Sequence, residues 1–359
     1  MANKTARLGD LATYINGYAF KPADWGDTGL PIIRIQDLTG NSYQLNRYDG
    51  EYPERIEVND GDVLISWSAS LGVYVWQRGK ALLNQHIFKV VFDKLPVNKE
   101  YFVFAVEHKL AEMESKTHGA TMKHIVKKDF DGTTIPYPPI EKQAEIADHL
   151  RRITSLIDKQ TEQLLLLDQL VKSRFIELFG DPQRNPHGYK HTKLSDIATY
   201  YNGLTYKPEN VAAEGTIVLR SSNIQNSQLD FADTICVDCA IKERLMVQKN
   251  DILMCSRNGS AKLVGKVALI KDIQEPMSFG AFMMIIRSHY FGYLMTYFQM
   301  DAFRQQIKTG ATTTINQITG RMLDDVTIPL PPMALVDQFA AFVEQTDKSK
   351  LCGRMEVAA

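Results

Sequence analysis

Few residues in this sequence form a pattern typical of metal binding or catalysis. Cys236 and Cys239 form a single C-x-x-C pair, which would supply two of the four ligands that a structural zinc ion needs. Cys255 alone does not complete such a site. We therefore interpret these cysteines as ordinary thiols of strands, and the sequence predicts no metal site.

Catalytic motifs are also missing from the sequence. His86, His118 and His124 have no partnered nucleophile, and neither a glycine-rich cofactor loop nor a P-loop occurs. Residues 135–138 look similar to the Asn/Asp-Pro-Pro-Tyr/Phe motif of adenine methyltransferases, but they lack the amide or carboxylate that holds the amino group. The chain is predicted to be a recognition protein and not an enzyme.

Two short polar segments carry side chains that could bind nucleic-acid bases. Asn84, Gln85 and His86 form the first, in which the two amides could pair bidentately with adenine. The alternative, that this segment is only a polar hairpin turn, remains equally open. Arg257 and Asn258 follow a predicted strand, and Arg257 has the chemistry to bind a guanine or a phosphate.

The elements that would position these segments occur twice, about 186 to 193 positions apart. The matched segments are 8–13 with 194–199, 16–17 with 202–203, 62–64 with 251–253, 119–121 with 310–312, and 135–139 with 328–332. Solenoid repeats are roughly 20–50 residues long, so this distance indicates two copies of a whole domain. Two similar domains suggest two similar targets held at a fixed separation.

Composition is that of an ordinary soluble globular protein, with 44% hydrophobic and 23% charged residues. No run approaches the roughly 18 apolar residues of a membrane span, and the first residues lack the apolar stretch of an export signal. Four cysteines in 359 residues do not make a disulfide framework, so the reducing cytoplasm is the expected location. The net charge of −1 counts against a free-standing nucleic-acid binder, though not against a subunit whose partner supplies positive surface.

Each repeated unit is predicted to be an α+β domain with a mostly antiparallel sheet. Short β-branched runs between turn residues predict strands at 32–35, 63–66, 87–91 and 217–219, and helices are predicted over 99–113 and 290–307. The expected organisation is a first domain over 1–139, a central helix over 140–180, a second domain over 181–332, a distal helix over 333–352 and a tail over 353–359.

The central helix is predicted from apolar residues that recur in alternating steps of four and three, the 3.5-residue period of a coiled-coil seam. The seam positions are Ile146, Leu150, Ile153, Ile157, Gln160, Leu164, Leu167, Val171, Arg174 and Leu178. A second apolar stripe lies beside the seam, at Leu156, Leu165, Leu166, Leu170 and Phe175. One partner helix would not cover both stripes, so we expect a partner helix and a further surface. A linker helix lying on one domain is the alternative.

The distal helix begins in the same phase, with Phe339 and Val343 at seam positions. Residues 351–354 interrupt its pattern, so it is expected to end near Cys352 at about half the length of the central helix. In an antiparallel pair it would lie first against the Leu178 end and would leave the seam around Leu150 uncovered. An uncovered apolar seam tends to recruit another chain.

This organisation resembles the specificity subunits of type I restriction-modification systems, over nearly the whole chain. The resemblance implies that each unit is a target recognition domain for one half of a bipartite double-stranded DNA site, and that the two helices pack antiparallel as the spacer. It implies that modification subunits dock on the helices, hold S-adenosylmethionine and flip the target adenine out of the duplex, and that restriction subunits associate through them. The chain itself would hold no cofactor and would not contact a membrane.

The resemblance places DNA contacts on donors and acceptors of loops and on cations. In the first unit the candidates are Arg34, Gln36, Ser66, Ser68, Asn84, Gln85, His86, Lys116, Thr121 and Lys123. In the second unit they are Arg220, Ser222, Asn223, Ser256, Arg257, Asn258, Lys262, Thr312, Thr313 and Asn316. Corresponding positions differ between the units, so the two half-sites are expected to differ in sequence.

Three further hypotheses stay open at this point. The short distal helix suggests a truncated form that completes its bundle by self-association or on a modification subunit. A truncated copy could also be a recombination variant that folds without assembling. Outside this family, the competing function is a scaffold whose two α+β heads bind protein ligands.

Overall fold

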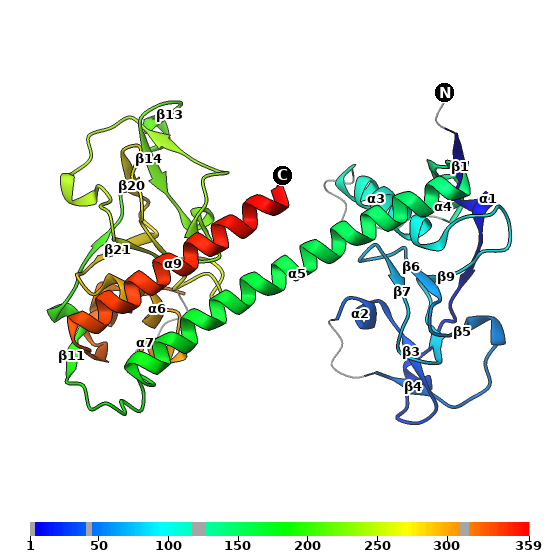
Figure 1. Ribbon diagram of the computed structural model, residues 1–359, viewed down its shortest axis with the longest axis horizontal. Helices are drawn as coiled ribbons and strands as arrows, with labels where there is room; N and C mark the ends of the chain where they lie inside the picture. Colours follow the sequence, from blue (N-terminus) through cyan, green and yellow to red (C-terminus); the bar gives the residue numbers. More distant parts are fainter. Residues whose placement is uncertain (1–3, 41–44, 117–126, 309–315, 359) are drawn as a thin grey trace. The chain divides into compact units, whose positions relative to one another are not determined.

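The computed structural model describes residues 4–40, 45–116, 127–308 and 316–358 of the chain. The chain divides into two compact units, residues 1–158 (unit 1) and residues 159–359 (unit 2), and the division falls within the long helix α5 (Figure 1). Each unit combines helices with small sheets, so the predicted α+β class and the two-domain repeat are confirmed.

Unit 1 is built on two four-stranded sheets, of order β2-β9-β6-β7 and β4-β3-β8-β5. All neighbours in the first sheet are antiparallel, whereas β3 and β8 of the second sheet are parallel. The strands are β2 (Thr13–Asn16), β3 (Leu30–Ile33), β4 (Arg47–Tyr48), β5 (Glu57–Val58), β6 (Val63–Ser66), β7 (Gly72–Val75), β8 (Ala81–Leu83) and β9 (Ile87–Val91), with β1 (Thr5–Arg7) paired to β10 (Thr134–Pro136). The helices are α1 (Leu8–Leu11), α2 (Ile35–Leu38), α3 (Lys99–Lys116) and α4 (Lys127–Gly132).

Unit 2 repeats this plan, with sheets of order β12-β21-β18-β19 and β13-β17-β14-β20 and a parallel pair between β14 and β20. Its strands are β11 (His191–Lys193), β12 (Thr199–Asn202), β13 (Val211–Ala212), β14 (Thr216–Leu219), β15 (Ile224–Gln225), β16 (Gln228–Leu229), β17 (Cys236–Val237), β18 (Ile252–Cys255), β19 (Val267–Leu269), β20 (Met277–Phe279), β21 (Met283–Arg287) and β22 (Thr327–Pro329). Its helices are α6 (Phe291–Tyr297), α7 (Asp301–Lys308), α8 (Gly320–Asp324) and α9 (Met333–Ala358).

The repeated Asn-Gly pair has a steric cause that is the same in both units. A Cβ atom on Gly17 would lie 2.0 Å from the carbonyl oxygen of Asn84, and one on Gly203 would lie 2.0 Å from that of Gly280. Only glycine permits so close an approach of two backbone segments. The end of β2 therefore lies directly against the loop between β8 and β9, and the end of β12 against the loop between β20 and β21.

Two sequence predictions about local structure are wrong. The predicted strand over 32–35 ends before Ile35, which begins α2 because the backbone N–H of Arg34 donates to the Asp37 carboxylate over 2.8 Å and caps a helical turn there. The helix expected over 290–307 is two helices, α6 and α7. The chain turns between them because the N–H groups of Gln299 and Met300 bond to carbonyls three residues back, which tightens and ends the helix.

The central helix forms as predicted. Helix α5 runs from Ile140 to Phe179, and the rise of about 1.5 Å per residue makes it a rod of roughly 60 Å. The buried side chain of Gln143 fixes its start in unit 1, where its Oε1 accepts from the N–H of Asn98 over 2.9 Å. Gly180 ends the helix with a positive φ of 74°, the usual conformation just beyond a helix C-terminus.

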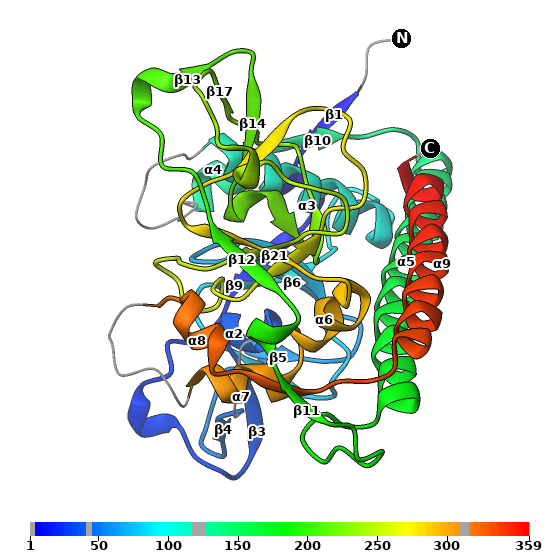
Figure 2. The ribbon, with the colours of Figure 1, turned by 90° about the vertical axis from the view of Figure 1, so that its left-hand side faces the viewer.

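Within unit 2, α9 packs antiparallel along the C-terminal half of α5 (Figures 1 and 2). The ring centroids of Phe175 and Phe339 are 5.6 Å apart, and Lys350 Nζ lies 2.6 Å from Asp168 Oδ1. These partners run in opposite directions along the two helices, so the expected antiparallel pairing at the Leu178 end is present. The expected end of α9 near Cys352 is wrong, since the helix continues to Ala358. A single glycine costs a helix only about 1 kcal/mol, so Gly353 need not end it.

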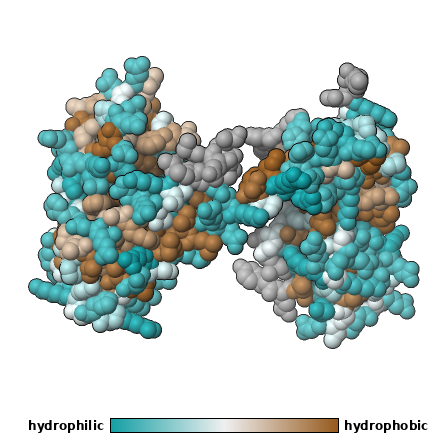
Figure 3. All heavy atoms as spheres, in the orientation of Figure 1, coloured by the Kyte–Doolittle hydropathy of each residue, from teal (hydrophilic) through white to brown (hydrophobic). Residues whose placement is uncertain are grey.

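The seam and the second stripe of α5 differ in exposure. From Gln160 to Leu178 the seam positions are half-buried. Phe175, a member of the predicted second stripe, is fully buried in the core of unit 2. The rest of that stripe is exposed, at 64% for Leu156, 59% for Leu165, 56% for Leu166 and 48% for Leu170. Hydrophobic atoms are accordingly visible along the course of α5 (Figure 3). Helix α9 does not cover the second stripe of α5.

Candidate nucleic-acid interface

Unit 2 brings Arg257 onto an exposed aromatic ring. Arg257 Cζ lies 5.5 Å from the ring centroid of Phe282, which is 59% exposed. The carbonyl of Phe282 accepts from the N–H groups of Ser256 and Arg257, each over 3.0 Å, and from the Ser256 hydroxyl over 2.9 Å. These bonds join the loop after β18 to the loop between β20 and β21. A guanidinium that rests on a ring keeps its donors free for a guanine edge or a phosphate.

Two predicted amides lie in the same cluster and shape it. Asn258 Nδ2 donates to the hydroxyl of Ser221 over 3.3 Å, and its Oδ1 accepts from the N–H of Ser260. Asn316 Nδ2 donates to the carbonyl of Gly259 over 3.2 Å. Asn316 therefore joins the consecutive candidates Arg257 and Asn258 from a distant segment of the chain. Ser256 is buried and positions the loop backbone.

The turn after β14 holds three further candidates in different roles. Asn223 is 1% exposed. Its Oδ1 accepts from the N–H of Arg220, and its Nδ2 donates to the carbonyls of Asp230 and Asp233. Arg220 itself forms a 2.8 Å salt bridge with Asp233. We therefore interpret Asn223 and Arg220 as structural, whereas Ser222 is exposed between them. Lys262 is exposed in the loop after β18.

Unit 1 repeats this turn with different residues. Arg34 Nε lies 3.5 Å from the buried carboxylate of Asp37, and Arg34 Cζ lies 5.5 Å from the ring of Trp25. The Arg34 side chain is only 16% exposed, so it also has a structural role. Gln36 is exposed at the position that corresponds to Ser222. The exposed position of the two turns thus carries an amide in one unit and a hydroxyl in the other.

The remaining candidates of unit 1 lie on two adjoining loops. Ser66 is buried, and its hydroxyl donates to the carbonyl of Ser68 over 3.3 Å. The ring centroids of Trp67 and His86 are 5.0 Å apart, and the backbone N–H of Trp67 donates to the His86 carbonyl. Asn84, Gln85 and His86 form the turn between β8 and β9, with Gln85 exposed. The segment is a turn, but it connects strands of two different sheets, so the alternative interpretation as a hairpin is wrong. Base contacts by the exposed Gln85 stay a prediction.

Some candidates cannot be placed, and some neighbours were missed. Lys116, Thr121, Lys123, Thr312 and Thr313 lie outside the residues whose side chains the structure describes. The aromatic residues Trp25, Trp67 and Phe282, which line these loops, were not predicted. Trp67 stands between two candidate serines in the sequence, and that position is the signal that could have identified it.

The described residues contain neither a cluster of metal ligands nor a membrane-spanning helix. No three His, Cys, Asp or Glu side chains of those residues are grouped closely enough to hold a metal ion. Burial raises the pKa of the Cys255 thiol, which disfavours the thiolate that a metal would need. Among the same residues, no helix combines the length and apolar character of a bilayer-crossing segment.

Comparison with known proteins gives the family. Residues 2–167 and 186–351 each match the model of the type I restriction modification DNA specificity domain. The chain belongs to this family. Both matched ranges include one repeated unit and part of the helix that follows it, so the internal repeat is a repeat of the family domain.

Relatives and solved structures agree with this assignment. The chain is 24% identical over 303 residues to the specificity subunit of the type I restriction enzyme EcoBI from Escherichia coli, covering 76% of this chain and 62% of that protein. It is 24% identical over 295 residues to the MjaVIII specificity subunit of Methanocaldococcus jannaschii, covering 76% and 68%. A type I S subunit from M. genitalium has a similar fold, with a TM-score of 0.58 at 14% identity over 99% of this chain and 92% of that chain.

Proposed function

We propose that this specificity-family chain recognises a bipartite double-stranded DNA site, with one half-site bound by each unit. The observation that carries the proposal is the match of both units to the DNA specificity domain. Each unit also presents exposed polar side chains on loops at one end of its sheets, the arrangement that base recognition needs. Salt-dependent binding to duplex DNA, by the chain alone and with a modification subunit, tests the proposal against the protein-scaffold alternative.

The two half-sites would differ because the units expose different side chains. Unit 2 presents Arg257 on Phe282, whereas the corresponding loops of unit 1 present Gln85 beside Trp67 and His86. Arginine favours guanine, whereas glutamine favours adenine. A site with two identical halves would not match this difference.

The Arg257→Ala substitution is expected to relax base preference at one position of one half-site. A good bidentate contact contributes about 1–3 kcal/mol of discrimination, so the preference should fall roughly 10- to 100-fold there. Competition binding with duplexes altered in one half-site at a time measures the change. Gln36→Ala in unit 1 is the matched control and should affect only the other half. Equal losses in both halves for Arg257→Ala would contradict the assignment.

The exposed stripe of α5 would be the dock for modification subunits, which would hold S-adenosylmethionine and join restriction subunits to the assembly. Replacing both Leu165 and Leu166 with serine should abolish co-purification with the modification subunit and leave the melting temperature nearly unchanged, because both side chains are already more than half exposed. Gln169→Ser on the same part of the helix is the control. Retention of the complex by the double variant would argue against this dock.

Self-association through the same apolar surface is the competing prediction. Sedimentation of the chain at micromolar concentration, without a modification subunit, distinguishes self-association from docking of a modification subunit. A monomer would exclude self-association, whereas a dimer that the Leu165 and Leu166 substitutions disrupt would support it.

A further inference from the structure

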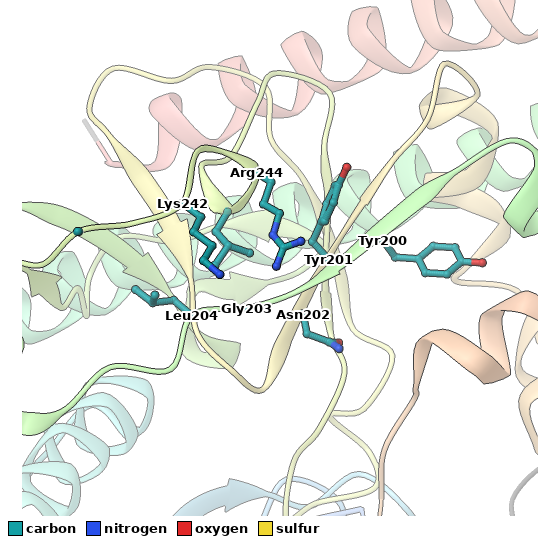
Figure 4. Close-up of a pocket in the computed structure, with 9 residues that line it drawn as sticks. Tyr200, Tyr201, Asn202, Gly203, Leu204, Lys242 and Arg244 are labelled. Atoms are coloured by element: carbon teal, nitrogen blue, oxygen red, sulfur yellow. The ribbon is translucent and has the colours of Figure 1, made fainter.

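Unit 2 contains a cationic pocket beside the Arg257 cluster. A cavity of about 400 Å³ lies between strand β12 and the turn η6 (Glu243–Leu245). The side chains of Lys242 and Arg244 extend toward the same space next to Gly203, with Tyr201 and Asn202 beside them (Figure 4). Among the residues that the structure describes, neither cation has a salt-bridge partner. Two cations without a neutralising carboxylate make a local positive potential that favours an anion.

The turn that carries these cations is held rigidly. Ser278, which is fully buried, donates to the Leu245 carbonyl over 2.9 Å, and the Val247 N–H donates to the Met277 carbonyl over 3.0 Å. Arg287 Nη2 lies 3.4 Å from the Met246 carbonyl and is itself held by the Asp251 carboxylate. Binding of an anion would therefore require little reordering of the turn, which favours affinity.

The pocket adjoins the loop that carries Phe282. The Leu204 N–H donates to the Phe279 carbonyl over 2.7 Å, and the Gly203 N–H donates to the Met283 carbonyl over 3.1 Å. These bonds hold both ends of the loop between β20 and β21, whose Phe282 ring contacts Arg257. In duplex DNA a phosphate accompanies every base, so a backbone phosphate would lie near any base that Arg257 contacts.

Unit 1 lacks the second cation at the corresponding place. The turn η2 (Glu54–Ile56) matches η6, and Arg55 corresponds to Arg244. Pro53 stands where unit 2 has Lys242, and the acidic Glu51 stands where unit 2 has Ala240. This turn therefore carries two cations in unit 2 and one in unit 1.

We propose that Lys242 and Arg244 seat a phosphate of the DNA backbone beside the half-site bound by unit 2. This inference rests on the proposed function, which it deepens. A phosphate contact fixes the position of the duplex without carrying sequence information. Unit 2 would thus bind the duplex backbone more firmly than unit 1, while Arg257 contributes separately to base preference.

The test is the salt dependence of binding to a mixed-sequence duplex by the full chain, alone and with its modification subunit. For the Lys242→Gln, Arg244→Gln double variant, the slope of log K against log salt should fall by about 0.9, the value for one phosphate. Preference between half-site sequences should stay as in the wild type. Both side chains are exposed, so the thermal unfolding curve should not change.

Arg55→Gln in unit 1 is the matched control and should leave the slope within experimental error. A double variant with the wild-type slope would overturn the phosphate seat while leaving DNA recognition intact. A fall of the same size for Arg55→Gln would contradict the special role of the pair. A wild-type chain that shows no salt-dependent DNA binding in either arm would overturn the proposed function itself.

Discussion

Replacing Phe175 with alanine is expected to lower the free energy of unfolding of unit 2 by about 3–5 kcal/mol, the usual loss for a buried phenylalanine. Phe175 is fully buried, and its ring centroid lies 4.9 Å from Phe179, 5.0 Å from Tyr293 and 5.6 Å from Phe339. The substitution would leave a cavity where α5, α6 and α9 meet. Urea unfolding of the full chain, with hydrogen exchange of the α6 and α9 segments, measures the loss.

Leu166→Ala is the control for this prediction, because Leu166 lies on the same helix but is 56% exposed. It should cost less than about 1 kcal/mol, as surface substitutions usually do. If Phe175→Ala and Leu166→Ala had equal effects, the packing of α5 into the core of unit 2 would be contradicted.

Asp251→Ala should destabilise unit 2 by about 3 kcal/mol, because it removes one partner of a largely buried ion pair. Asp251 is fully buried and accepts from Arg287 Nε over 2.7 Å and from Arg287 Nη2 over 2.8 Å. Its carboxylate holds the pKa of Arg287 above the ordinary value for arginine. The guanidinium would lose this partner while still 27% exposed, which places the cost at the low end of the range. Chemical denaturation of the full chain checks the value.

Asp62 supplies the matched control, because it has the same place in the repeat. Its carboxylate accepts from the N–H of Asn59 over 2.9 Å, as that of Asp251 accepts from Gln248 over 2.7 Å. No salt bridge to Asp62 occurs among the described residues. Asp62→Ala should therefore cost only about 1 kcal/mol, the value of a lost capping bond. A loss as large as that of Asp251→Ala would show that the turn, and not the ion pair, provides the stability.

Features with a periodic or repeated signal could be predicted from the sequence. The heptad spacing and the lack of any proline or glycine between Pro139 and Gly180 predicted α5 almost to the residue. The repeat predicted two copies of one fold, and the β-branched run 63–66 is β6. These signals are patterns in the order of residues along the chain, so they can be read without knowing the tertiary contacts.

Features that depend on distant partners could not be predicted in this way. Whether Asn223 reads a base or holds a turn depends on carbonyls seven and ten residues away. Phe282 joins the Arg257 cluster through a loop between two other strands. The unpaired state of Lys242 and Arg244 is likewise visible only when their neighbours in space are known.

Methylation mapping of a genome in which this chain is expressed with a modification subunit would show whether each unit reads one half of a DNA site. We expect methylated adenines at one bipartite motif, whose two specified halves differ in sequence and are separated by a fixed number of unspecified bases. An uninterrupted motif, or two halves of identical sequence, would contradict the assignment of one differently equipped unit to each half.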